Sequence, residues 1–505
     1  MSFAMMRFFK TGFLSKTVFG PLAVGMACSF AVTPLQAQPS GLPNLGAASA
    51  ADLSPALERT LGEAIMEQGR RDPTYVADPE VNQYLTQLGH SLATSAATGA
   101  GQEITVFAVR DPQINAFALP GGYIGINSGL VVSSESESEV AGVVAHEIGH
   151  VLQRHVARGM TQQERSGHLL MASMAAALIA GLAGGGDLAM GVAAFGQAAA
   201  IDQQLGFSRQ AEQEADRVGL DMMRRAGFDP QGMVKTFGRL MNASRLNEGT
   251  GGGAYASTHP LSIQRMSDME NRIRSQAASS GARNDDVFWY IRAKLRVMQA
   301  RSGTQPANVV AEFKRETTLG GPRAEAAWYG LAYAALQGND LSQAEEYLKQ
   351  AGWPTTDIAP VHNLAVALRI KQKRWDDALR LSQEAVQRWP QDLGIALSRV
   401  DALQAAVQDT EALTFLQSAI KKWPREARLY QLQAGSYERL NQGIEARRAM
   451  ARYYEQVGAL PAAIEQLKQA RALSTDFYVQ SQIDVEIRRL QETVLANRAL
   501  LERFR

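Results

Sequence analysis

The strongest restriction on the fold is a repeat in the C-terminal part of this 505-residue chain. The dipeptide Trp-Pro occurs at 389–390 and again at 423–424, a spacing of 34 residues. Alanines recur at the same spacing in two series: Ala378, Ala412 and Ala446, and Ala385 and Ala419. Because small side chains at fixed positions let paired helices approach closely, this period predicts a stack of similar helical hairpins.

The spacing, the small residues in the second helix of each unit and the closing proline resemble the tetratricopeptide (TPR) repeat. The resemblance covers residues 285–490 and becomes weaker toward the end. It implies an α-helical solenoid with a concave binding surface. An unrelated helical bundle is the alternative interpretation, and residues 491–505 are expected to form a C-terminal helix or tail.

Charge and cysteine content exclude some classes of function. Lys and Arg number 51 and Asp and Glu number 50, which gives a formal net charge of +1. A nucleic-acid-binding protein needs a basic field, and this balance supplies none, so no nucleic-acid partner is expected. The single cysteine, Cys28, lies in an N-terminal segment that is expected to be removed, so a metal site must use nitrogen and oxygen ligands.

The N-terminus has the pattern of an export signal, residues 1–37. Basic residues at Arg7, Lys10 and Lys16 precede an uncharged apolar run, and a cleavage site follows after Ala37. The run is short for a membrane-spanning helix, which needs about 20 residues. A retained anchor and a lipoprotein attached through Cys28 are the alternatives. Residues 38–55, rich in Pro, Ala, Ser and Gly, are expected to be a flexible leader.

Residues 56–280 mix helical and strand patterns and are expected to form one domain. The segments "ITVFAVRD" (104–111) and "NAFALPGGYIGINSGLV" (115–131) have strand-like composition, with a Pro-Gly-Gly break in the second. One helix is predicted over 134–160 and another from Ser208. The chain is therefore predicted to be mainly α-helical with a small β-sheet.

Two segments of this domain allow several interpretations. Residues 169–200 are small and apolar, and two close-packed helices, a membrane-touching hairpin or a lid would each fit them. Residues 246–260 are expected to form a long glycine-rich loop, with low backbone order unless other contacts hold it in place.

The segment "VVAHEIGHVLQRH" (143–155) carries the metal-binding pattern. On a helix, His146 and His150 lie 40° apart, so both imidazoles can reach one ion, and Glu147 lies beside them. This is the HExxH arrangement of zinc peptidases, with two ligands and a general base. By the same arithmetic His155 lies 180° from His146, so it is expected to be a structural or surface group.

A third ligand is expected in the helix "FSRQAEQEADRVGLDMM". Glu212 is the candidate ligand, and Asp216, one turn later, is placed to accept the free N–H of a ligand histidine. Glu214 points about 200° away from Glu212 and is the alternative ligand. Two histidines, one glutamate and one open position describe a catalytic zinc site rather than a structural one.

Four segments, "NAFALPGGYIGINSGLV", "HEIGHVLQRH", "SRQAEQEAD" and "STHPLSIQRM", resemble the HtpX/BepA-type gluzincin metallopeptidases in order and spacing. With a signal peptide and TPR tail, the resemblance narrows to the BepA-like periplasmic members. It implies one zinc ion per chain, bound by His146, His150 and Glu212, with Glu147 as general base. The resemblance covers about residues 55–280, and at most peripheral membrane contact is expected.

Further roles are hypotheses. Arg265 is the candidate to stabilise the oxyanion formed during peptide hydrolysis, with an ion pair to the Asp216 region as the alternative. His259 follows the glycine-rich loop, so it is a candidate fourth zinc ligand in a resting enzyme; the alternative is a loop histidine. His90, His168 and His362 have no partners at ligand spacing and are expected to be structural or exposed.

These patterns predict an exported zinc metalloendopeptidase that degrades misfolded or stalled envelope proteins in the periplasm of a Gram-negative bacterium. An extended substrate could pair with an edge strand, and the TPR region could recruit substrate or the outer-membrane β-barrel assembly machinery. The alternative is a chaperone or scaffold with latent peptidase activity, and a cytosolic or organellar protease remains if the signal is misassigned.

Overall fold

Helices make up most of the computed structural model, which describes residues 54–97, 102–162, 207–246, 255, 258–275, 285–302 and 306–502. Several predictions lie outside these residues: the signal peptide (1–37), nearly all of the leader, His168, the apolar segment 169–200 and most of the glycine-rich loop. The elements described below belong to one compact unit, Pro43–Arg505. None of the helices in the described part of the chain combines the length and apolar character needed to cross a membrane.

Two capped helices open the described chain, α1 (Pro55–Gly69) and α2 (Pro79–Thr94). Each begins with proline after a side chain that accepts a backbone hydrogen bond: Ser54 accepts from Leu57 N–H, and Asp78 from Val81 N–H. Proline lacks an N–H that the first helical turn would leave unpaired, so this arrangement favours a helix start.

The predicted strands form one small sheet with strand order β1-β3-β2. β1 (Thr105–Val109) runs parallel to β3 (Tyr123–Asn127), whereas β2 (Ala116–Leu119) runs antiparallel to it. The Pro-Gly-Gly break reverses the chain between β2 and β3 through two glycines with φ of 81° and 90°, a backbone conformation that glycine adopts without strain. Both predicted strand segments are confirmed, and β2 lies at an edge of the sheet.

The end of the second strand-like segment was wrongly assigned, because residues Ser128–Ser133 form the short helix α3. The Ser128 hydroxyl and the Gly129 N–H both donate to the carbonyl oxygen of Asp111, at 2.9 and 2.8 Å. These bonds turn the chain out of the sheet. A short buried apolar run has the same appearance in either structure, so periodicity could not separate them.

The predicted helix over 134–160 is also wrong in one respect, because it is two helices. α4 covers Glu137–Leu152 and α5 covers His155–Gln162. Between them Arg154 has a φ of 52°, in the left-handed region, so the direction of the chain changes at this point. Angles between side chains that are calculated for one continuous helix therefore do not apply to residues on opposite sides of Arg154.

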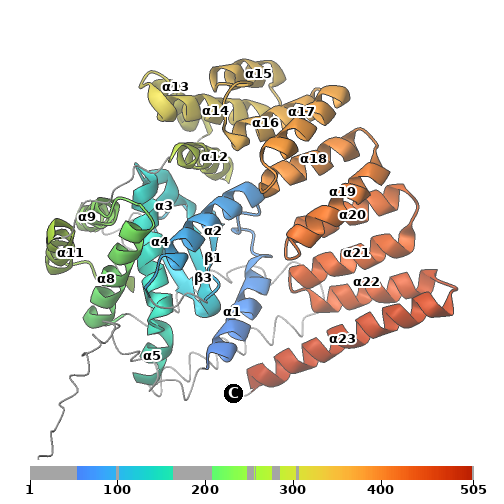
Figure 1. The fold of residues 1–505 in the computed structure, drawn as a ribbon, viewed down its shortest axis with the longest axis horizontal. Helices are drawn as coiled ribbons and strands as arrows, with labels where there is room; N and C mark the ends of the chain where they lie inside the picture. Colours follow the sequence, from blue (N-terminus) through green and yellow to red (C-terminus); the bar gives the residue numbers. More distant parts are fainter. Residues whose placement is uncertain are drawn as a thin grey trace, which may run out of the picture. The chain divides into compact units, whose positions relative to one another are not determined.

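Three further helices complete this region: α8 (Arg209–Arg225), α9 (Gln231–Leu246) and α11 (Ile263–Ser275). α4 packs against α8 and α9, as Figure 1 shows. Glycines make this contact close: a Cβ on Gly149 would lie 2.9 Å from the Ala215 backbone, and one on Gly142 would lie 2.6 Å from Met233 Cα. The backbones of α4 and α8 can therefore bring charged side chains together in the core.

The rest of the described chain is helical. Its helices are α12 (Asp286–Ser302), α13 (Pro306–Glu316), α14 (Gly321–Gln337), α15 (Leu341–Gln350), α16 (Ala359–Lys371), α17 (Trp375–Arg388), α18 (Leu393–Ala405), α19 (Asp409–Lys422), α20 (Ala427–Arg439), α21 (Gly443–Gln456), α22 (Leu460–Leu473) and α23 (Phe477–Glu502). α23 continues through the expected boundary at residue 490. Figure 1 shows α16 to α21 as successive helices lying side by side.

The backbone repeats with the period expected from the sequence. One residue in the turn inside each of four helical pairs has a left-handed φ near 60°, and these residues are 34 positions apart: Asn339, Lys373, Val407 and Asn441. The alanines of both series are buried in the second helices of these pairs. The predicted architecture, mainly helices with a small sheet followed by a helical repeat region, is confirmed, and the identity of the repeats as TPR units stays a prediction.

Polar contacts join the two regions within this unit. Lys294 Nζ of α12 lies 2.8 Å from Asp78 Oδ2 and 2.7 Å from Glu80 Oε2. The side-chain amide of Gln83 accepts from Leu393 N–H and donates to the Gln391 carbonyl, at the start of α18.

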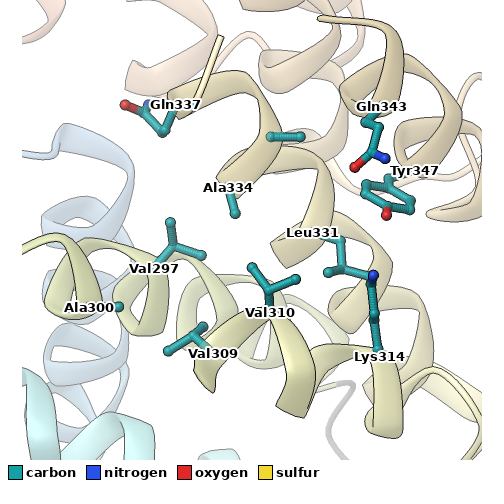
Figure 2. A pocket seen from close by; sticks show the side chains of 12 residues that line it. Val297, Ala300, Val309, Val310, Lys314, Leu331, Ala334, Gln337, Gln343 and Tyr347 are labelled. Atoms are coloured by element: carbon teal, nitrogen blue, oxygen red, sulfur yellow. The ribbon is translucent and has the colours of Figure 1, made fainter. Parts of the chain in front are cut away.

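A hollow of about 290 Å³ lies among α12, α13, α14 and α15. Figure 2 shows its mainly apolar lining, which includes Val297, Val309, Val310 and Leu331, together with the amine of Lys314. Its lining residues include no histidine, cysteine or carboxylate, so it offers none of the usual metal ligands.

Candidate metal centre

Four buried side chains converge in the region that precedes α12: His146, His150, Glu212 and His259. One ligand atom from each lies within 4.8 Å of the others. His146 Nε2 and His150 Nε2 are 3.0 Å apart, and His150 Nε2 lies 3.3 Å from Glu212 Oε1. His259 Nδ1 lies 3.1 Å from the same glutamate oxygen.

Local structure explains how the first three come together. Four residues separate the two histidines of α4, so they share one face of the helix. Glu212 lies in the first turn of α8, whose start is capped by Ser208. The close contact of Gly149 with Ala215 then brings the start of α8 beside the histidines.

Glu147 lies next to the cluster and is itself buried. Its Oε1 is 3.4 Å from the hydroxyl of Tyr255 and 3.5 Å from His259 Nε2. Its Oε2 has no hydrogen-bond partner among the described residues. One oxygen of this carboxylate is therefore oriented by neighbours, while the other is available to accept a proton.

Asp216 holds the other side of His146. The Nδ1–H of His146 donates to Asp216 Oδ1 at 3.0 Å, which leaves Nε2 to face the cluster. Arg265 donates two hydrogen bonds to the same carboxylate, both 2.8 Å long. Burial opposes the charged form of Asp216, but the bonds from Arg265 and His146 hold its pKa below the usual value.

Arg265 is engaged with acids rather than free for an oxyanion. Besides Asp216 it pairs with Glu212, whose Oε2 lies 2.6 Å from Nη1, and it donates to the Pro260 carbonyl at 2.9 Å. The alternative interpretation, an ion pair with the Asp216 region, is the arrangement that the structure contains. A direct catalytic role for Arg265 stays a hypothesis, which this geometry does not support.

The charges at the centre are strongly coupled. Burial would raise the pKa of Glu212, but His259, His146 and His150 hold it well below its usual value. Burial likewise opposes a charge on His146, yet its hydrogen bonds to Asp216 and Glu212 raise its pKa to about 9. For His150 burial prevails, and its pKa lies well below the ordinary value.

Two aromatic residues that sequence reasoning missed enclose the centre. Tyr255 stacks on His259, with ring centroids 4.5 Å apart and planes at 25°. Phe207 covers His150 at 4.0 Å between centroids. An aromatic residue within the glycine-rich loop, four positions before His259, was the available signal for Tyr255.

His155 lies outside the ligand cluster, as expected, but the helical arithmetic that turned its ring away from the site does not hold. Its Nδ1 lies 2.9 Å from Nδ1 of His150, and its Nε2 lies 3.0 Å from Glu214 Oε2. The break at Arg154 turns the ring back toward α4. His155 and Glu214 are nevertheless outside the four-residue cluster. Of the remaining histidines, His90 is exposed, and His362 contacts the Thr356 carbonyl.

The donor set fits a zinc ion. Zinc takes imidazole nitrogen and carboxylate oxygen, and three of its four ligands commonly come from the protein in catalytic sites. Glu212 Oε2 and His259 Nε2 are buried atoms without a hydrogen-bond partner among the described residues. Arg265 is close to Glu212 Oε2 but not in a hydrogen-bonding direction. Buried polar atoms without hydrogen bonds are rare, and a cation bound at this cluster would account for both.

A small hollow adjoins the centre next to the edge strand. It is lined by Ala118 and Leu119 of β2, by His150 and Val151 of α4, and by Ala157 of α5. The ion pair between Arg154 and Glu58, 2.7 Å, lies at the same hollow. The hollow therefore joins β2 to His150 of the cluster.

Comparison with known proteins agrees with this geometry. Residues 79–273 match the model of peptidase family M48 and form an M48 peptidase domain. The chain is a zinc metalloendopeptidase.

Along most of its length the chain is similar to the β-barrel assembly-enhancing protease of Escherichia coli strain K12, with 28% identity over 468 residues and 92% of each chain covered. A relative from Vibrio cholerae, also named for β-barrel assembly enhancement, is 33% identical over 339 residues, which are 65% of this chain and 66% of the relative. The mitochondrial metalloendopeptidase OMA1 of Arabidopsis thaliana is 36% identical over 173 residues, 34% of this chain and 32% of that protein.

Proposed function

We propose that His146, His150 and Glu212 hold the zinc ion and that Glu147 is the general base of peptide hydrolysis. The observation that carries this proposal is the convergence of the buried ligand atoms within 4.8 Å. The free Oε2 of Glu147 lies on the same helical turn.

The chain's own residues supply the rest of the chemistry. When bound here, zinc supplies a Lewis acid that activates water and polarises a peptide carbonyl. Glu147 takes the proton of the attacking water at Oε2 and passes it to the departing amine. Asp216, fixed by Arg265, orients His146. Tyr255 orients Glu147 through its hydroxyl.

His259 is proposed to fill the fourth position in a resting state. Its Nδ1 lies 3.3 Å from His146 Nε2 as well as 3.1 Å from Glu212 Oε1, so it occupies space that a substrate carbonyl would need. Replacing His259 by Ala should increase casein cleavage at unchanged zinc content. Unchanged or lower activity would argue against this role.

The proposed substrates are misfolded or stalled envelope proteins in the periplasm. Edge-strand pairing along β2 recognises backbone rather than side chains, which suits unfolded chains. The names of the relatives from E. coli and V. cholerae point to outer-membrane β-barrel assembly. The repeat region is proposed to recruit substrate or the assembly machinery. N-terminal sequencing of the exported protein tests the signal peptide, with cleavage expected after Ala37.

A chaperone or scaffold with latent peptidase activity is the second candidate. The buried side chain of His259 favours latency, because it lies against Glu212 in the space that a substrate would need at the cluster. The two candidates differ in whether the cell needs peptide hydrolysis or only binding.

Glu147→Gln in the full-length protein separates them. Loss of the general base should reduce hydrolysis of an unfolded β-barrel polypeptide by about 10²- to 10⁴-fold. Zinc content and binding of the same polypeptide should stay unchanged. The exposed His90→Ala is a matched control and should cleave like the wild type. If the Glu147→Gln gene still complements an envelope-stress phenotype, the enzymatic proposal is replaced by the chaperone one.

Metal analysis tests the ligand set independently. Glu212→Gln should lose zinc during dialysis against a weak chelator, whereas the wild type keeps it. Full retention of zinc by Glu212→Gln would remove Glu212 from the ligand set.

A further inference from the structure

His155 and Glu214 form a chain of contacts behind His150 that the zinc chemistry described above does not use. His155 is the first residue of α5 and is 2% exposed. Its Nδ1 lies 2.9 Å from His150 Nδ1, and its Nε2 lies 3.0 Å from Glu214 Oε2. Arg158 Nη1 donates to the same glutamate oxygen at 2.9 Å. The contacts therefore run from His150 to an arginine in three steps.

The contact between two Nδ1 atoms restricts where the protons lie. At 2.9 Å, one nitrogen must carry a proton and the other a lone pair. His150 Nε2 faces His146 Nε2 and Glu212 Oε1, so as a metal ligand it must present a lone pair there. The proton of His150 is then on Nδ1, and His155 Nδ1 accepts it as a hydrogen bond.

The contacts beyond His155 fit this assignment of protons and require no other tautomer. With its Nδ1 accepting, neutral His155 carries its proton on Nε2 and donates it to Glu214 Oε2. A carboxylate can only accept, and Arg158 completes its partners and balances its charge. In each of the three contacts from His150 to Arg158, one atom is therefore a donor and the other an acceptor.

We infer that His155 is a positioning residue that holds His150 in the tautomer able to bind zinc, with Glu214 fixing the tautomer of His155. This inference rests on the proposed ligand role of His150. The two ligand histidines are then supported differently, because Asp216 contacts His146 directly whereas Glu214 acts on His150 through a second imidazole. The support for His150 exists only because Arg154 breaks the helix and returns His155 to α4.

A packing role for the same ring would depend on its volume, whereas a tautomer role depends on its acceptor atom. The test compares His155→Leu, which fills the space without an acceptor, with His155→Asn, whose amide oxygen can replace the accepting Nδ1. Both are made in the full-length protein carrying Glu147→Gln, so that proteolysis does not interfere. Zinc affinity is measured by competition with a chromophoric chelator, and the visible spectrum is recorded after Co²⁺ replaces zinc.

His155→Leu should bind zinc about 10- to 100-fold more weakly, the effect typical of losing a partner of a ligand histidine, with an altered Co²⁺ spectrum. His155→Asn should recover most of the affinity and the wild-type spectrum. Removal of the carboxylate in Glu214→Leu should weaken zinc binding as well, but less than His155→Leu. Thermal unfolding of the metal-free proteins shows whether each variant folds, and Glu214→Leu serves if His155→Leu does not fold.

Wild-type zinc affinity and spectrum in His155→Leu would overturn the inference, as would equal loss in the Leu and Asn variants. His150→Ala separates this failure from that of the proposed function. If His150→Ala keeps wild-type zinc affinity, the ligand set itself is wrong, whatever the His155 variants show.

Discussion

In the M48 domain, helices α4 and α8 meet around charged and ionisable side chains, whereas helices α16 to α21 meet mainly around alanine, leucine and valine. The centre buries three carboxylates, Glu147, Glu212 and Asp216, each of which contacts a histidine or an arginine. In the repeats, Ala378 of α17 packs in an apolar cluster with Val366 of α16 and Ala402 of α18.

This difference has an energetic meaning. A buried charge is tolerated only while its partners are present, so removal of one member affects all the others. A buried alanine between helices depends only on the space available, and each repeat contacts only its neighbours. Substitutions in the M48 domain should therefore change metal binding and stability together, whereas those in the repeats should change stability alone.

The largest effect is expected for Asp216→Asn. The change removes one of the two buried carboxylates that pair with Arg265, and breaking a buried pair costs about 3–5 kcal/mol. It also replaces the charged acceptor of His146 by a neutral amide oxygen, so zinc affinity should fall, by up to about 10- to 100-fold. Urea unfolding of the metal-free protein and chelator competition measure the two effects. The control is Asp268→Asn, in an exposed pair with Arg272, which should change neither the free energy of unfolding nor the zinc affinity by much. Unchanged zinc affinity in Asp216→Asn would contradict this coupling.

A smaller effect is expected for Ala378→Leu in the repeats. The side chain is fully buried between α16, α17 and α18, and added methylene groups in such a site cost about 1–3 kcal/mol. Zinc affinity should stay at the wild-type value, which separates the two regions. Ala472→Leu, at an exposed position of α22, should have little effect on unfolding. A parallel loss of zinc affinity in Ala378→Leu would show that the regions are not independent.

Val407→Asn should stabilise the repeats by about 1 kcal/mol, because it removes the strain of a β-branched residue at a left-handed φ. Val407 has a φ of 60° and is 77% exposed, and Asn already occupies the matching turn position at Asn339 and Asn441. Thermal unfolding measures the gain. Val485→Asn, an exposed valine within α23, should show no such gain. Equal changes in both variants would rule out turn strain as the cause.

The smallest effect concerns Glu67 of α1, which lies against Gly458 in the turn before α22. Burial raises the pKa of Glu67 to about 7, opposed by Arg70 and Arg71 and helped by Glu63 and Glu455. Because the folded-state pKa lies above the unfolded value, stability should fall as the pH rises from about 4.5 to 7.

Glu67→Gln removes this pH dependence. The variant should match the wild type at about pH 4.5 and exceed it by about 1 kcal/mol or less at pH 8, since this partly exposed site is screened by solvent. Urea unfolding at the two pH values measures the difference, with Glu492→Gln, at an exposed position of α23, as control. A constant difference at both pH values would point to packing instead of ionisation.

Much of the architecture could be predicted from local patterns. The 34-residue spacing of Trp-Pro and alanine appears in the backbone as left-handed turns at the same interval. Both strand segments and the capped start of α8 follow from composition and capping residues. Patterns of this kind succeed because helix faces, strand propensity and caps depend on residues close together in the chain.

The error about His155 has a tertiary origin, whereas the error at Ser128–Ser133 came from a short apolar run that periodicity cannot assign. The angle between His146 and His155 was taken along a continuous helix, and a single left-handed residue, Arg154, made that angle irrelevant. The tertiary contacts that support a left-handed residue there come from elsewhere, including the ion pair of Arg154 with Glu58.

Helical geometry alone was thus enough to place His146, Glu147 and His150 together, because the spacing of the side chains on one helix is set by the backbone. The rest of the centre depends on contacts between segments far apart in the chain. Packing brings α4 close to α8 at Gly149 and places Phe207 and Tyr255 over the ligand histidines. It also pairs Arg265 with Asp216. His155 behind His150 shows this most clearly, since its place was set by a turn in the backbone and not by its distance along the helix.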